Sequence, residues 1–257
     1  MTRIKIMGLS LVAVFAMAAM AASSASATPT FYECAKAAKV GKFYTGKYND
    51  KNCTEVNGKS EGKYELKEGV GKGKVFKGKG AAAVLHTPAV GGEVTCKGSK
   101  DEGKNTLTGQ KEVKVTFTGC ASLGKTCNSV GAKSGEIKTN PLAGTLGYIS
   151  ATGPKVGVSL TGEAGKPSAE FACGTGAGSL NIVTTGAVIG EITGDINKIS
   201  KEATDAFTVT GEGFQTVTSF EGGPLEVLET SINGSPNFES GEQTTTLNKG
   251  EALEIKA

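Results

Sequence analysis

The stretch EVKVTFTGC, residues 112–120, decides the fold. Val113, Val115 and Phe117 alternate along it with polar residues. A β-strand turns successive side chains to opposite faces, so this period of two predicts a strand with one buried and one solvent-facing side. We therefore expect the three apolar side chains to face the interior of a β-sheet.

The same alternation recurs along most of the chain. It predicts that Phe207 and Val209 point inward in DAFTVTG, and that Leu253 and Ile255 do so in EALEIKA. Glycine-rich turn signals separate these segments, and ECAKAAK, residues 33–39, is the one piece with a helical pattern. Short alternating segments between regular turns are typical of all-β proteins, so we expect an antiparallel β-sandwich or barrel-like domain.

The N-terminal end of the sequence has the pattern of a secretory signal. Arg3 and Lys5 precede an apolar run, and Ala25 and Ala27 fit the small-x-small pattern of a cleavage site. We expect a signal peptide at residues 1–27, which would be removed on export. The mature protein would then be secreted and extracellular, with no integral membrane segment.

Lysine supplies all the basic side chains of the expected mature chain, which has neither Arg nor Trp. Residues 28–160 hold 21 Lys against 11 acids, a net charge of +10, and residues 161–257 hold 5 Lys against 14 acids, a net charge of −9. Base recognition in DNA relies on arginine, and binding of single strands relies on stacked aromatic rings. The composition therefore argues against a nucleic-acid partner.

Lysines are most concentrated in GKGKVFKGKG, residues 71–80. Two interpretations fit this run. An anionic polymer of the cell envelope could bind through point charges, which makes four side chains candidate polyanion contacts: Lys72, Lys74, Lys77 and Lys79. Alternatively, the lysines protect an exposed strand edge from aggregation, and we favour this second interpretation.

Six cysteines follow the expected signal peptide: Cys34, Cys53, Cys96, Cys120, Cys127 and Cys173. An even number of cysteines in an exported protein indicates disulfides, and six allow fifteen pairings. Nearness in sequence favours Cys34–Cys53 and Cys120–Cys127. The pair that remains is Cys96–Cys173, which would join inward positions of two distant strands.

The segment 28–80 differs from the rest of the chain. It holds most of the tyrosines and one local cysteine pair. About 50 residues with one disulfide would be only marginally stable alone. We therefore expect a disulfide-bonded N-terminal arm at 28–80, packed on a main antiparallel β domain at 81–257.

Several stretches together resemble a known family. They include GKYNDKNCTE, GEVTCKGS, VKVTFTGC, GEIKTNPLAGTLGYI, AEFAC and FEGGPLEVLETSINGSP, in this order. They are similar to a large paralogous family of uncharacterised secreted proteins from actinobacteria. The resemblance covers nearly the whole expected mature chain and implies an exported, disulfide-bonded β-protein. It carries no assigned activity, and therefore no catalytic residue.

Residue types that support catalysis or metal binding form no clear pattern. The single histidine, His86, is expected to be a surface or half-buried strand residue, because no nucleophile motif accompanies it. We expect no catalytic residue, no metal site and no cofactor. The Asp and Asn clusters in YNDKNCTE and GSKDEGKN are interpreted as turns rather than calcium loops, and acids such as Asp195 as solvated positions of strands or turns.

Two classes of function remain, with a third less favoured. The first is an exported non-enzymatic structural or binding protein, associated with the cell envelope through charge. The second is a small-ligand binder with a pocket inside a barrel or sandwich, and the third is a secreted hydrolase. A barrel mouth lined with apolar residues would favour the second class. A filled core under a flat charged surface would favour the first.

Overall fold

The computed structural model describes residues 28–87 and 92–257, and the expected signal peptide lies outside them. Within these ranges every regular element is a β-strand or a short 3-10 helix. The 3-10 helices are η1 (Gly71–Lys74), η2 (Glu163–Gly165) and η3 (Gly176–Gly178). In the same part of the chain no helix has both the length and the hydropathy needed to cross a bilayer. The expected all-β fold is confirmed.

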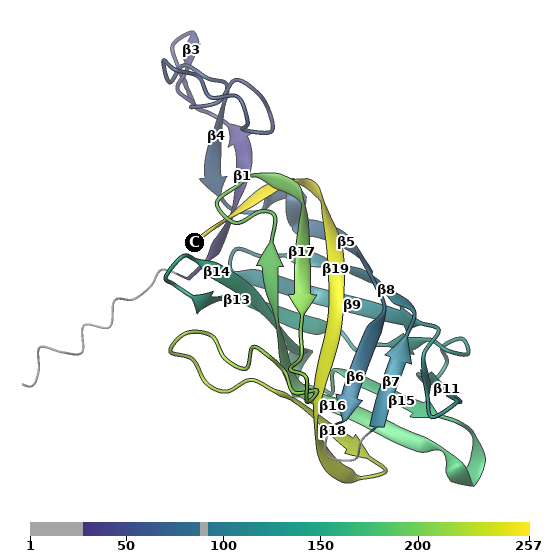
Figure 1. Cartoon of the computed structure of the whole chain (residues 1–257). Coiled ribbons are helices and arrows are strands. Elements are labelled where there is room, and N and C mark those ends of the chain that lie inside the picture. Colours follow the sequence, from purple (N-terminus) through teal and green to yellow (C-terminus); the bar gives the residue numbers. More distant parts are fainter. Residues whose placement is uncertain (1–27, 88–91) are drawn as a thin grey trace, which may run out of the picture.

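Eight antiparallel strands close on themselves and form what we call the first ring (Figure 1). Around the ring they follow the order β5, β8, β9, β13, β14, β16, β17 and β19, and β19 pairs again with β5. Their bounds are β5 (Val75–Gly80), β8 (Gly98–Asn105), β9 (Gly109–Thr118), β13 (Leu142–Ser150), β14 (Lys155–Gly162), β16 (Leu180–Thr193), β17 (Ser200–Phe207) and β19 (Ser235–Lys256). The closed order confirms a barrel-like arrangement.

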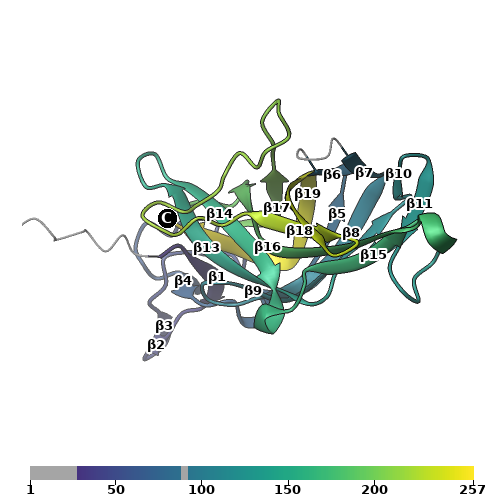
Figure 2. The same ribbon diagram turned by 90° about the horizontal axis from the view of Figure 1, so that it is seen from below.

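The long strands β16 and β19 extend beyond the first ring into a second closed set of pairings, which we call the second ring. It runs through β6, β7, β10, β11, β15, β16, β18 and β19 and returns to β6. The new strands are β6 (Ala83–Thr87), β7 (Gly92–Cys96), β10 (Ala121–Ser122), β11 (Lys125–Asn128), β15 (Ala169–Cys173) and β18 (Leu228–Ile232). Figure 2 shows β6, β7 and β10 along one side of this end, and β15 and β16 along the other. The short strand β12 (Ile137–Lys138) pairs with β9.

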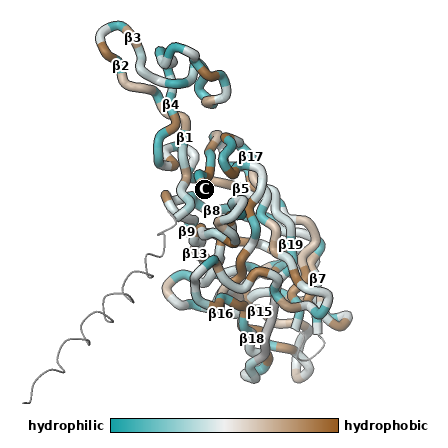
Figure 3. Tube along the Cα trace, turned by 60° about the vertical axis from the view of Figure 1, so that its left-hand side comes forward, coloured by the Kyte–Doolittle hydropathy of each residue, from teal (hydrophilic) through white to brown (hydrophobic). Residues whose placement is uncertain are grey.

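The period-two pattern fills both rings. Val113 and Val115 on β9 are buried, as are Leu253 and Ile255 on β19, so the predicted inward faces are confirmed. Figure 3 shows hydrophobic and hydrophilic residues interleaved along the strands rather than gathered in one segment. An apolar cluster that includes Phe31, Leu253 and Ile255 closes the end of the first ring nearest the arm.

The N-terminal arm projects from the first ring (Figure 1). Its strands are β1 (Thr30–Lys36), β2 (Lys39–Val40), β3 (Phe43–Tyr44) and β4 (Tyr64–Glu68). The first part of β1 pairs with β19, and the rest pairs with β4, so one strand joins the arm to the body. The helical pattern at residues 33–39 gave a wrong prediction, since pairing on both sides of β1 overrides a weak local preference.

Strand β5 lies inside the first ring, between β8 and β19. The main sheet thus begins before residue 81, and the interpretation of GKGKVFKGKG as a strand edge is wrong. The lysines of β5 are exposed, whereas its glycines face the interior. A Cβ on Gly80 would clash with Ser99 Oγ and Gln243 Nε2, so any larger residue there would have to displace these two side chains. Close packing across the ring therefore explains the alternation of Lys and Gly.

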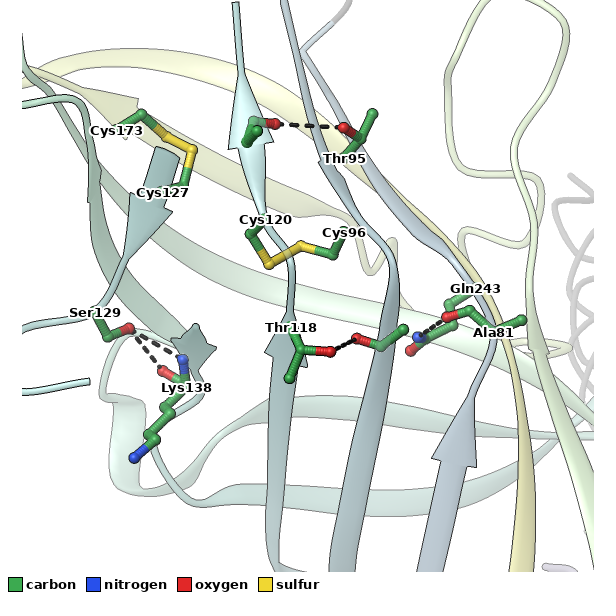
Figure 4. Close-up of a disulfide and its surroundings, with 12 residues drawn as sticks. Ala81, Thr95, Cys96, Thr118, Cys120, Cys127, Ser129, Lys138, Cys173 and Gln243 are labelled. Carbon is green, nitrogen blue, oxygen red and sulfur yellow. Dashed lines mark hydrogen bonds between the residues drawn. A yellow bond between two sulfur atoms is a disulfide. The ribbon is translucent and has the colours of Figure 1, made fainter. Parts of the chain in front are cut away.

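All six cysteines are paired, and two of the three predicted pairs are wrong. Cys34–Cys53 is confirmed, but the other bonds are Cys96–Cys120 and Cys127–Cys173. Cys127 and Cys173 are register partners on β11 and β15, 4.0 Å apart between Cα atoms. The short β10–β11 hairpin brings Cys120 near Cys127, yet each sulfur bonds to a strand outside the hairpin. The two bonds lie close together in the second ring (Figure 4).

Candidate functional site

A cavity of about 170 Å³ lies where the interiors of the two rings meet. Phe76, Val113 and Leu247 of the first ring line it, together with Ala169 and Phe171 of the second. Its wall is mostly apolar, because the inward positions of the alternating strands converge there. The core is therefore not completely filled by side chains.

Polar side chains of the first ring form one part of the cavity wall. Asp101 on β8 and Asp205 on β17 both belong to it, together with Gln243 and Thr245 on β19. The Asp101 carboxylate accepts a hydrogen bond from Ser99 Oγ at 2.9 Å, and Gln243 Nε2 donates to the Ala81 carbonyl at 3.0 Å. These groups are mostly satisfied by neighbouring protein atoms and so help to define a fixed wall.

Asp205 is the exception among the acids of this wall. Its side chain is buried, and its Oδ1 atom has no hydrogen-bond partner. Ser168 Oγ, also at the cavity, is buried and unpartnered as well. Buried polar groups in folded proteins are nearly always hydrogen-bonded, and the cost of leaving a carboxyl unpaired is large. Two free polar atoms in one apolar cavity are consistent with a site that a ligand completes.

Burial raises the pKa of Asp205 to about 8, because the apolar interior disfavours the charged form. The nearby charge of Asp195 raises the pKa further, and that of Lys249 opposes it. Burial also raises the pKa of Asp101, against the hydrogen bond from Ser99. The two acids of the cavity wall therefore hold their protons more tightly than solvated aspartates do.

A buried ion pair joins β19 to the segment that follows β16. Lys249 Nζ lies 2.5 Å from Asp195 Oδ2, and both side chains are almost completely buried. The prediction that Asp195 is solvated is wrong, because the backbone after β16 is hydrogen-bonded to Ile255 of β19 and the Asp195 side chain is buried there. Lys249 thus pairs with Asp195, and no cation among the described residues forms an ion pair with Asp205.

His86 is half-buried on β6, between two acids that belong to neighbouring strands. Its Nδ1 lies 3.1 Å from Glu93 Oε1, and its Nε2 lies 3.5 Å from Glu242 Oε2. Glu242 also lines the cavity, although its side chain is 52 % exposed. The cavity therefore extends to a part of the wall that is close to solvent.

The four lysines of the predicted polyanion contact lie away from the cavity. Lys72 and Lys74 belong to η1, and Lys77 and Lys79 point outward from β5. All four are exposed on the outer surface of the first ring. Contact with an anionic envelope polymer stays a prediction for this surface.

Of the two Asp/Asn clusters interpreted as turns, one is a turn and one is a strand. In YNDKNCTE, Asp50 accepts hydrogen bonds from the backbone N–H groups of Asn52, Thr54 and Glu55, which confirms a turn. The N–H of Glu55 contributes most to lowering the pKa of the Asp50 carboxyl. GSKDEGKN is strand β8, with Asp101 on its inner face.

Sequence reasoning did not single out Asp205, although a signal for it was present. Phe207 was predicted to face inward, and the period of two places residue 205 on the same face. Phe207 does line the cavity, next to Asp205. A charged residue at an inward position of an otherwise regular strand is thus the feature that locates this site.

Comparisons with known protein families, with curated proteins and with solved structures found no match to this chain. The resemblance to a secreted actinobacterial family therefore stays a prediction. Three disulfides among the described residues indicate folding in an oxidising environment. The role of the site has to be inferred from its own residues.

Proposed function

We propose that this protein is an exported, non-enzymatic binding protein that holds one small ligand between its two rings. The observation that carries the proposal is the apolar cavity with the unpartnered Oδ1 of Asp205 in its wall. Of the classes considered from the sequence, the small-ligand binder fits this interior best. A cavity inside a closed set of antiparallel strands is largely pre-formed, as small-ligand sites usually are.

The size of the cavity limits the ligand. An apolar cavity of about 150 Å³ in another protein remains dry and binds benzene. At about 170 Å³, this cavity has room for a body the size of one aromatic ring with a short substituent. The apolar wall supplies the hydrophobic driving force, and the polar part of the wall orients one polar group of the ligand.

The test is thermal unfolding of the protein, without its signal segment, in the presence of toluene and benzyl alcohol. Ligands with about eight heavy atoms reach dissociation constants of about 0.1–1 mM, so a tenfold excess over Kd should stabilise the fold by about 1.4 kcal/mol. For a chain of this size that corresponds to a rise in Tm of about 3–6 °C.

Two alanines on β15 provide a matched pair of variants. Ala169 lines the cavity, whereas Ala172 lies at a position of the opposite face. Ala169→Leu should fill part of the cavity and abolish the rise in Tm, and Ala172→Leu should leave it unchanged. Equal rises in both variants, or no rise in the unmodified protein, would exclude this cavity as the binding site.

A further inference from the structure

The cavity is one-sided in charge. Among the residues described along its wall, the buried ionisable groups are Asp101 and Asp205, and both are acidic. The nearest buried cation, Lys249, is bonded to Asp195. An anionic ligand would thus enter a wall of acids without a positive partner, whereas a cation would supply the partner that Asp205 lacks.

We infer that the ligand is a small organic amine, whose ammonium group pairs with the Asp205 carboxylate while its apolar body fills the cavity. This inference rests on the proposed function and names the ligand class of the same site. A neutral ligand could give Asp205 Oδ1 one hydrogen bond, but it would supply no positive charge to pair with the carboxylate. A buried carboxylate is stable when it is both paired and hydrogen-bonded, and an ammonium group does both.

Binding of an amine has a defined proton balance. Below about pH 8 the free protein carries Asp205 as the neutral acid, because burial and Asp195 raise its pKa. When an ammonium ion binds, the Asp205 carboxyl releases one proton to the solvent, and the carboxylate pairs with the cation. No covalent bond forms. Asp101, Asp195 and Lys249 are the other charged groups that act on Asp205, and Asp195 and Lys249 are already bonded to each other.

Proton release makes the affinity for an amine depend on pH in a characteristic direction. Between pH 6 and pH 8 a proton competes with the amine for Asp205, so affinity should rise by about tenfold for each pH unit. A neutral hydrogen-bond acceptor would behave in the opposite way. It would bind the protonated acid best and lose affinity as pH rises beyond about 8.

The experiment is isothermal titration of the protein with benzylamine, benzyl alcohol and benzoate, three probes of nearly equal size that differ in charge. We expect benzylamine to bind most tightly, to release close to one proton at pH 7, and to gain affinity up to pH 8. In Asp205→Asn, benzylamine should lose its advantage over benzyl alcohol and its pH dependence. Glu229→Gln, at an exposed position of β18 away from the cavity, should retain both.

The outcomes separate this inference from the proposal on which it rests. If benzyl alcohol binds as tightly as benzylamine at every pH, the ligand class is wrong and the cavity remains a binding site. If benzoate binds best, the inference from charge is overturned. If none of the three probes binds, the proposed function itself fails. Folding of Asp205→Asn is checked in the same samples by circular dichroism.

Discussion

Asp205→Asn is expected to stabilise the protein by on the order of 5 kcal/mol at pH 9, while leaving its stability at pH 4 nearly unchanged. The pKa of the Asp205 carboxyl is about 8 in the folded protein against 3.8 for a solvated aspartate. Asparagine has the shape of the protonated acid and never ionises. It therefore removes the cost of a buried charge at high pH and changes little at low pH.

The direction follows from proton counting. Between about pH 4 and pH 8 the folded protein holds the Asp205 proton and the unfolded chain has released it, so the folded state binds more protons. The free energy of unfolding must then fall as pH rises, by about 1.4 kcal/mol per pH unit from this one group. Above pH 8 both states have released the proton, and the contribution becomes constant.

Denaturant unfolding between pH 4 and pH 9, with the disulfides intact, measures this effect. The difference between the unmodified protein and Asp205→Asn should grow from about pH 4 to about pH 8 and then level off. Glu229→Gln, at an exposed position of β18, is the control and should produce no such growth. Parallel curves for the unmodified protein and Asp205→Asn would contradict a raised pKa at this position.

Lys249→Met should destabilise the protein by about 3–5 kcal/mol, because it leaves the buried Asp195 carboxylate without its partner. Lys249 Nζ and Asp195 Oδ2 are 2.5 Å apart, and neither side chain reaches solvent appreciably. The second oxygen of Asp195 has no hydrogen-bond partner, so the pair is imperfectly satisfied. Removing one partner of such a buried pair strongly destabilises a protein, whereas replacing both partners with apolar residues often leaves its stability unchanged or raises it.

A double variant distinguishes loss of the pair from loss of packing. Asp195→Leu combined with Lys249→Met removes both charges and keeps apolar volume in the ring. Its free energy of unfolding should return to within about 1 kcal/mol of the unmodified protein, or exceed it. If the double variant is as unstable as Lys249→Met alone, then shape and not charge determines the role of these residues.

The all-β fold could be predicted because alternation is a local property of the sequence. EVKVTFTGC and EALEIKA became β9 and the end of β19 with the expected faces inward. Closure of the ring could not be predicted from the sequence in the same way. It depends on the pairing of β19 with β5, which precedes it by more than 150 residues, and no local pattern encodes that contact.

The errors have the same origin. Cys127–Cys173 follows from the register between β11 and β15, and nearness in sequence favoured Cys120 instead. The run GKGKVFKGKG was interpreted as an exposed strand edge, yet Gly78 and Gly80 fit against Asp101, Ser99 and Gln243 across the ring. The site was missed because Asp205 is one acid among many in the sequence, and its inward position two residues before Phe207 is the one signal that distinguishes it there.

The most direct test of an amine site at Asp205 is the carboxyl-carbon NMR signal of this residue at pH 7, recorded with and without saturating benzylamine. In the free protein the signal should lie at the position of a neutral acid, because the pKa of Asp205 is about 8. Benzylamine should move it to the carboxylate position, and benzyl alcohol should not. A carboxylate signal in the free protein, or a signal that benzylamine leaves unmoved, would contradict the claim that Asp205 is a buried, protonated acid that ionises when an ammonium group binds.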